Sequence, residues 1–255
     1  MRCHAASEPM EQIMNVRRTG FPNPFITIEC QTNRIEAASI PTHIYETYAQ
    51  CNEDLIVEAL LRAHLSRTGR SMDSIRYIEI GANHPFQTSS TYLFYKIHGA
   101  SGVLVEAIPA LADRLRQARP RDVVVNCAIS ALHDEKISLH IHEKSEISSV
   151  STEHIGLFQN LGGTEGIVQT IVCDNMHIND FLKRHFGNYC DYMSIDVEGL
   201  DLMLVTEMDT CFQPFLIQCE HEGRVSGFVD VLKPRGYVLL ALTDVNAIFV
   251  RAPMS

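Results

Sequence analysis

The chain has 255 residues, of which 45% are hydrophobic and 20% are charged. This length and composition suit one domain with a substantial core and exclude a disordered chain. A formal net charge of −10 at pH 7 argues against a nucleic-acid partner, because an acidic surface repels a phosphate backbone.

Two further features concern the compartment. The N-terminus MRCHAASEPMEQIM lacks the apolar core of a signal peptide, and no stretch is apolar over the length of a membrane span. The eight cysteines form no C-x-x-C pair, and several lie in apolar runs such as VVVNCAI, where a free thiol behaves as a small hydrophobe. We expect a cytoplasmic protein with reduced thiols and no membrane partner.

Residues 1–52 are polar and interrupted by Pro22, Pro24 and Pro41. We interpret them as an N-terminal arm or cap, in which FITIEC favours a short strand, followed by one domain over residues 53–255. Asn52 is a suitable helix cap. The apolar residues after it recur at three- and four-residue steps up to Ala63, which predicts a helix that ends at Gly69.

Apolar runs typical of strands then alternate with amphipathic segments. The predicted strands are residues 75–80, 102–106, 122–129, 137–142, 167–173, 191–196, 215–220, 236–242 and 246–250. The predicted helices are residues 88–98, 109–118, 177–186, 200–208 and 224–233. This order indicates an α/β, Rossmann-like fold with a mostly parallel, seven-stranded sheet covered on both faces. Only three residues join the last two strands, so these strands should form an antiparallel hairpin.

Residues 143–166 are polar, rich in Ser and Gly, and without periodicity. Long loops of this kind in compact domains cover substrates or are simply mobile at the surface, and the sequence leaves both alternatives open.

Ligands of open α/β sheets bind beyond the carboxyl ends of the strands. The first such end, YIEIGANHP, turns at Gly81, and the second, VLVEAIP, ends at Glu106. A carboxylate at this position suits a ribose diol. GANHPF has one glycine where a dinucleotide fingerprint has three, which favours a cofactor without phosphates over NAD. His84, in the same loop, either contacts cofactor or substrate or is only structural.

The motifs EIGANHP, VLVEAIP, NCAIS, SIDVEGLD and N-x-I-F resemble, in order and spacing, those of the FkbM-family methyltransferases over about residues 53–250. The GANHP version resembles one subgroup. The resemblance implies a class I, S-adenosylmethionine-dependent methyltransferase. It places one set of residues along the methionine part of the cofactor: Glu79, Gly81, Ala82 and Asn83. It places Glu106 at the ribose and a second set near adenine: Ala107, Ile108, Cys127 and Ala128. Many family members have Asp where this chain has Glu79.

The third strand end, SIDVEGLD, offers Asp196 and Glu198, and the next, CEHEG, offers Glu220 and His221. Adjacent parallel strands should bring Asp196 and Glu220 to one edge beside the reactive methyl group, so that Asp196 also borders the cofactor. In one interpretation Asp196 and Glu220 bind Mg²⁺ or another divalent cation, with Glu198 as a further ligand. In the other, which we favour, Asp196 or His221 is a general base and the remaining acids orient hydroxyl groups.

Three other polar side chains receive structural interpretations. Asp201 suits the N-terminus of its helix through the helix dipole. His177 and His185 are expected at the surface.

The resemblance implies O-methylation of a small-molecule or glycan acceptor at the hydroxyl of a sugar, glycan or secondary metabolite. N-methylation is the alternative within the same chemistry. A second class is a nucleotide-binding α/β protein that transfers no methyl group, such as an NAD-dependent dehydrogenase. A third is an inactive scaffold, which the retained acids disfavour.

Overall fold

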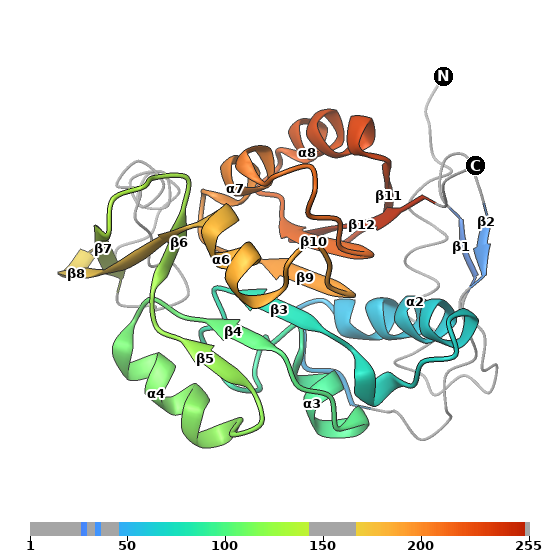
Figure 1. Ribbon diagram of the computed structural model, residues 1–255, viewed down its shortest axis with the longest axis horizontal. Coiled ribbons are helices and arrows are strands. Elements are labelled where there is room, and N and C mark those ends of the chain that lie inside the picture. Colours follow the sequence, from blue (N-terminus) through green and yellow to red (C-terminus); the bar gives the residue numbers. More distant parts are fainter. Residues whose placement is uncertain (1–26, 30–33, 37–45, 143–166, 253–255) are drawn as a thin grey trace.

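A seven-stranded sheet forms the centre of the molecule (Figure 1). The computed structural model describes residues 27–29, 34–36, 46–142 and 167–252. The strands of the sheet are β3 (Tyr77–Ile80), β4 (Val103–Val105), β5 (Val123–Val125), β9 (Tyr192–Ile195), β10 (Leu216–Glu220), β11 (Tyr237–Leu242) and β12 (Asn246–Arg251). Their order across the sheet is β11-β12-β10-β9-β3-β4-β5.

The directions of these strands match the sequence prediction. β5, β4, β3, β9 and β10 are mutually parallel, whereas β12 runs antiparallel to both β10 and β11. β3 is followed in the chain by strands on one side of it and later by strands on the other, so the order reverses between β3 and β9. The predicted Rossmann-like sheet with a C-terminal antiparallel hairpin is confirmed, and the reversal marks where ligands of such sheets bind.

Within the residues that the structure describes, three helices pack on each face of the sheet (Figure 1). α2 (Glu53–Arg67), α3 (Tyr92–His98) and α4 (Pro109–Ala118) pack on one face. α6 (Ile178–His185), α7 (Asp201–Glu207) and α8 (Val225–Leu232) pack on the other. Short 3₁₀ helices at Met72–Ser74 and Lys233–Arg235 lie in the connections.

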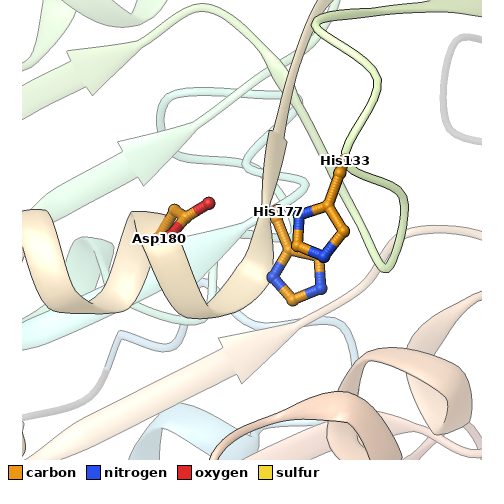
Figure 2. Close-up of side chains that lie close together, drawn as sticks. All are labelled: His133, His177 and Asp180. Atoms are coloured by element: carbon orange, nitrogen blue, oxygen red, sulfur yellow. The ribbon is translucent and has the colours of Figure 1, made fainter.

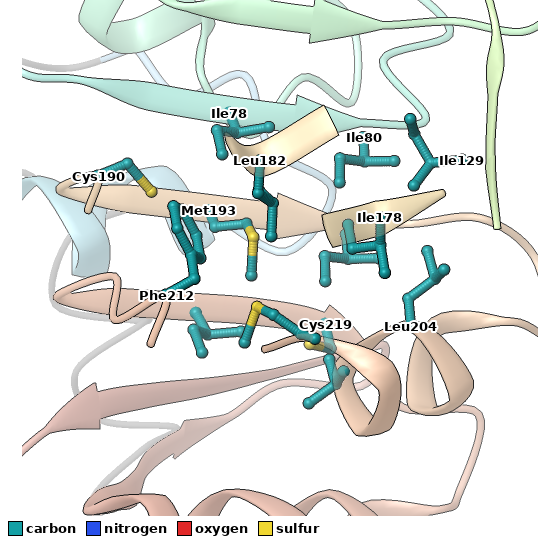
Figure 3. Close-up of a cluster of buried hydrophobic side chains, with 14 of the residues drawn as sticks. Ile78, Ile80, Ile129, Ile178, Leu182, Cys190, Met193, Leu204, Phe212 and Cys219 are labelled. Carbon is teal, nitrogen blue, oxygen red and sulfur yellow. The ribbon is translucent and has the colours of Figure 1, made fainter. Parts of the chain in front are cut away.

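The alternation of side chains along β3 divides the core between these faces. Tyr77 packs with α2 and α3, whereas Ile78 and Ile80 pack with the helices of the opposite face. Figure 3 shows Ile78 and Ile80 in the same cluster of buried side chains as Met193 of β9 and Leu182 of α6. Each such side chain contributes roughly 1.5–3 kcal/mol by leaving water, so this packing fixes the position of the strand end that follows Ile80.

A second sheet differs from the prediction. β6 (Ala128–Ser130), β8 (Ile167–His177) and β7 (Lys136–His142) form it in that order. The predicted strand 122–129 is therefore wrong as a single strand. It ends at Val125 because the side-chain amide of Asn126 donates to the carbonyl oxygens of Glu106 and Ala107, at 2.8 and 3.1 Å, and draws the chain away from the central sheet. β8 also continues four residues beyond its predicted end at 173.

The start of α2 is as predicted, but its cap is not. Asn52 has a left-handed backbone (φ 65°) and no capping hydrogen bond. Glu53 instead accepts a hydrogen bond from the backbone N–H of Cys51, at 2.8 Å, and Asp54 accepts those of Thr47 Oγ1 and the backbone N–H of Tyr48.

In the N-terminal region β1 (Thr27–Glu29), within FITIEC, pairs antiparallel with β2 (Arg34–Glu36). The other residues up to 45 and the segment 143–166 lie outside the described residues. The division of the chain at residue 52 stays a prediction.

Within the described ranges, no helix combines the length and apolar character needed to cross a bilayer. The six cysteines of this part of the chain carry free thiols.

Candidate active site

The ends of β3, β4 and β9 meet at Gly81. The backbone N–H groups of Gly81 and Ala82 both donate to the carbonyl oxygen of Val105, at 3.0 and 2.9 Å, and the N–H of Asp196 donates to that of Ile80 at 2.9 Å. Gly81 has φ +85°, and a β-carbon on it would lie 1.7 Å from the carbonyl oxygen of Asp196. Only glycine fits this turn.

Glu106 lies against the same turn, as the sequence predicts. Its carboxylate accepts the backbone N–H of Asn83 at 2.9 Å and that of Ile108 at 2.7 Å. The residue is 6% exposed, and this burial raises the pKa of Glu106, while the two N–H donors act in the opposite direction. The carboxylate therefore joins the GANHP turn to the start of α4.

The carboxylate of Glu79 is occupied within the protein. Its Oε1 accepts the backbone N–H of Ser90 at 2.7 Å, and its Oε2 accepts the hydroxyl groups of Ser89 and Thr91. The guanidinium of Arg119 lies 3.5 Å from Oε2. Burial raises the pKa of Glu79 and Arg119 opposes the shift. Glu79 thus holds residues 89–91, which lead into α3.

Arg119 is the central residue that sequence reasoning missed. It is fully buried and donates to Asp122 Oδ2 at 2.6 Å, to Ser89 Oγ at 3.0 Å and to the Tyr77 hydroxyl at 3.2 Å. Arg119 precedes a proline at the end of a helix, where an arginine is usually solvated, so only its burial reveals the role. Its charge offsets those of the buried acids Glu79 and Asp122.

His84 supports its own loop. Its Nδ1 accepts the backbone N–H groups of Phe86 and Gln87, at 3.3 and 2.9 Å, and its ring contacts the ring of Phe86 edge to face. This arrangement favours the structural alternative for His84.

The residues predicted near adenine lie in two environments. Ala107 and Ile108 pack with the buried Ala128 beside the small sheet. Cys127, also buried, packs instead in the large core on the α6 side of the central sheet. The structure therefore brings three of the four together as an apolar wall next to Glu106.

A carboxylate cluster lies beyond the ends of β9 and β10. One oxygen each of Asp196, Glu198 and Glu220 lies within 4.8 Å of the others. Burial, followed by the charges of Glu220 and Glu198, raises the pKa of Asp196 well above its ordinary value. The side chains of Asp196 and Glu220 therefore lie close together, as predicted.

Asp201 has more than the predicted helix-end role. It is fully buried at the first position of α7, and its Oδ2 accepts the backbone N–H of Val197 at 3.3 Å, which closes the DVEGLD turn. Burial and the charge of Glu220 raise the pKa of Asp201 well above its ordinary value. Asp201 therefore places a fourth carboxyl group close to Glu220 of the cluster.

Both ring nitrogens of His221 are engaged elsewhere. Nδ1 accepts the backbone N–H of Gly223 at 2.9 Å, and Nε2 lies 3.2 Å from the carbonyl oxygen of Thr243. In this arrangement Nε2 carries the proton and donates it, so His221 holds the β10 end to the β11–β12 turn.

A sequence model of the methyltransferase FkbM domain matches residues 79–239, more than half of the chain. The chain belongs to the FkbM methyltransferase family. The match begins at Glu79 on β3 and ends at Leu239 on β11, so it includes Gly81, Glu106 and the carboxylate cluster. The family resemblance seen in the motifs is thus confirmed, and the fold is the predicted Rossmann-like class I methyltransferase fold.

Three solved structures of methyltransferases are among those similar to this FkbM-family protein. The N-terminal domain of human METTL16 in complex with SAH is 11% identical over 84% of this chain and 75% of that chain, with a TM-score of 0.43. The O-methyltransferase from Bacillus cereus in complex with SAH is 12% identical over 98% and 93%, with a TM-score of 0.43. SAH-bound PaMTH1 from Podospora anserina is 11% identical over 98% and 90%, with a TM-score of 0.37. No curated protein sequence matches the chain.

Proposed function

We propose that this FkbM-family protein uses S-adenosylmethionine to methylate a hydroxyl group of a sugar, glycan or related secondary metabolite. The observation that supports this cofactor best is the hydrogen bonding of the backbone N–H groups in the GANHP turn, residues 81–85. The backbone N–H groups of Gly81, Ala82 and Asn83 all donate to protein oxygens, the first two to Val105 and the third to Glu106. A pyrophosphate needs such groups free, whereas S-adenosylmethionine has no phosphate.

Glu106 is proposed to hold the ribose. Its two oxygens accept the backbone N–H groups of Asn83 and Ile108, and the N–H of Ala107 also acts on this carboxylate. A carboxylate has about four acceptor positions, so acceptor capacity remains for a ribose hydroxyl. The apolar wall of Ala107, Ile108 and Ala128 is suited to one face of adenine. Cys127 packs in the large core and is not part of this wall.

The methionine part is proposed to lie along Gly81, Ala82 and Asn83. Glu79 contributes to this part of the site through the loop it holds, since both of its oxygens accept hydrogen bonds from residues 89–91. The Glu in place of the family's usual Asp is long enough to reach that loop.

Asp196 is proposed as the general base. S-adenosylmethionine, when bound, supplies an activated methyl group. An acceptor hydroxyl must lose its proton as its oxygen attacks, and a carboxylate with a raised pKa accepts that proton more readily than an ordinary one. His221 suits this role less well because both of its nitrogens are engaged. Glu198 and Glu220 are proposed to accept hydrogen bonds from neighbouring hydroxyls of the acceptor.

A metal-assisted version of the reaction is the second possibility. Asp196, Glu198 and Glu220 have oxygens close enough to share a divalent cation, and oxygen-only ligands suit Mg²⁺. Such an ion would lower the pKa of the acceptor hydroxyl. We favour the version without metal, in which Asp196 performs this task.

The test of this proposal is a methyl-transfer assay with isotopically labelled S-adenosylmethionine. Carbohydrate acceptors are compared with amines, and each reaction is run with chelator and with added Mg²⁺. We expect labelled carbohydrate products with the methyl group on oxygen and no effect of the chelator. Labelled amines alone would favour N-methylation. Activity that is abolished by chelator and restored by Mg²⁺ would favour the metal-assisted version. No transfer to any acceptor would count against the reaction with metal and against the reaction without it.

A further inference from the structure

Away from the proposed active site, two histidines and one aspartate approach one another at the N-terminus of α6 (Figure 2). His177 is the last residue of β8 and precedes α6, Asp180 lies in the first turn of α6, and His133 lies in the loop between β6 and β7. One ligand atom of each residue lies within 4.8 Å of the others. We propose that these residues bind a divalent transition-metal ion of the zinc class.

The burial of His177 is the observation that points to a ligand. The sequence pattern predicts this residue at the surface, but it is 6% exposed, so that prediction is wrong. Its Nδ1 accepts the backbone N–H of Asn179 at 3.2 Å. Among the described residues, its buried Nε2 has no hydrogen-bond partner. A buried polar nitrogen without a partner is costly and rare in native proteins, and a metal ion would satisfy it.

A second carboxylate lies beside that nitrogen. Glu207 Oε1, at the end of α7, is 3.6 Å from His177 Nε2, and the backbone of Glu207 is held to α6 by a hydrogen bond from Asn179 Nδ2 at 3.1 Å. Two imidazoles with two carboxylates suit Zn²⁺ and its neighbours in the transition series, whereas Mg²⁺ prefers oxygen ligands alone. The carboxylates also offset the positive end of the α6 dipole, which disfavours a cation.

Metal binding requires a small rearrangement of the two rings. The His133 ring is stacked on that of His177, with centroids 4.2 Å apart and planes inclined by 9°. Imidazole lone pairs lie in the ring plane, so parallel rings do not point at one ion. His133 and Asp180 are exposed and have room to turn. Coordination through Nε2 also moves the His177 proton to Nδ1, and the hydrogen bond from Asn179 is then lost.

Such an ion would connect three parts of the chain. His133 follows β6, which pairs with β8 through Ser130 and His177, and Glu207 belongs to the helical face of the central sheet. The ion would therefore fasten the small sheet to the domain and add to the stability of the holoprotein, independently of the methyl-transfer reaction.

The test uses the full chain after removal of metals by chelation. Titration calorimetry and thermal melting are performed with ZnCl₂ and with MgCl₂, on the wild type and on His133→Ala, Asp180→Asn and the control His140→Ala, a histidine on β7 outside the cluster. We expect the wild type and the control to bind Zn²⁺ and to melt at a higher temperature when Zn²⁺ is present. The affinity for Zn²⁺ should be at least about tenfold lower in the two cluster variants. MgCl₂ should leave the melting temperature of the wild type unchanged.

Cysteine sites elsewhere are distinguished with Co²⁺. A nitrogen and oxygen site gives d–d absorption without the sulfur charge-transfer band of a thiolate site. If His133→Ala and Asp180→Asn bind Zn²⁺ as tightly as His140→Ala does, or if every Co²⁺ spectrum carries the thiolate band, the proposed site does not exist.

Discussion

The α-carbon of Gly81 faces the backbone carbonyl of Asp196 so closely that a β-carbon at residue 81 would lie 1.7 Å from that oxygen. The N–H of Asp196 donates in turn to the carbonyl oxygen of Ile80. The turn proposed to hold the cofactor and the strand end proposed to hold the base are therefore one packed unit. A change at residue 81 must displace Asp196.

Gly81→Ala is predicted to abolish cofactor binding. The added methyl group collides with backbone, which cannot turn away as a side chain can, and the positive φ adds strain. The matched control is Gly99→Ala, which has φ +70° but nothing within 4 Å of its β-carbon. Both variants should lose about 1 kcal/mol from the positive φ, but only Gly81→Ala should lose binding of S-adenosylhomocysteine in calorimetry. Equal affinities of the two variants would contradict the packing described for this turn.

Asp196→Asn is predicted to retain cofactor affinity and to lose turnover by about 10²- to 10⁴-fold, because the amide cannot accept the proton of the acceptor. Its thermal midpoint should equal or exceed that of the wild type, since the amide removes a carboxyl whose ionisation is disfavoured by burial and by the neighbouring acids. Asp230→Asn, at an exposed position on α8, is the control. Turnover that survives in Asp196→Asn would remove this residue from the mechanism.

Arg119→Met is predicted to destabilise the fold by about 3–5 kcal/mol, because Glu79 and Asp122 would remain buried without their cation. Arg116 provides the comparison, since it pairs with Asp113 across the same spacing on the exposed side of α4. Arg116→Met should cost less than about 1 kcal/mol. Chemical denaturation measures the free energy of unfolding of each variant. Similar losses of stability in the two variants would mean that the buried ion pairs of Arg119 stabilise the fold no more than an exposed pair does.

Asp54 is predicted to make stability depend on pH. Burial raises the pKa of Asp54 to about 6, so the folded state binds a proton more tightly than the unfolded state, and stability falls as pH rises through this range. Between pH 4.5 and 7.5 the wild type should lose about 2 kcal/mol relative to Asp54→Asn, which has no ionisable group there. The free energies of unfolding at the two pH values measure this difference. If the wild type and Asp54→Asn differ in free energy of unfolding by the same amount at both pH values, Asp54 has an ordinary pKa in the folded protein.

The strands and helices of the central fold could be predicted because each one has its own hydrophobic periodicity and is bounded by turn residues such as glycine. Ile78 and Ile80 belong to an unbroken apolar run, and Gly81 ends it. The break after Val125 could not be predicted, because it depends on hydrogen bonds from Asn126 to residues about twenty positions earlier in the chain. An apolar run carries no sign of such a contact.

The same limit applies to the site. Strand-end acids such as Asp196 and Glu220 are predictable because parallel strands bring their carboxyl ends together. The burial of Arg119 and His177 is not predictable, since both are polar residues at helix ends where solvent is the ordinary partner. Glu79 shows an intermediate case: its position was predicted, but its saturation by Ser89, Ser90 and Thr91 was visible only in three dimensions.

The most direct test of the account is a calorimetric comparison of S-adenosylhomocysteine and NAD as ligands of the wild-type protein. If the N–H groups of the GANHP turn are committed to Val105 and Glu106, S-adenosylhomocysteine should bind with one site per chain and NAD should produce no heat of binding. Saturable binding of NAD without binding of S-adenosylhomocysteine would contradict the proposed cofactor and the function built on it.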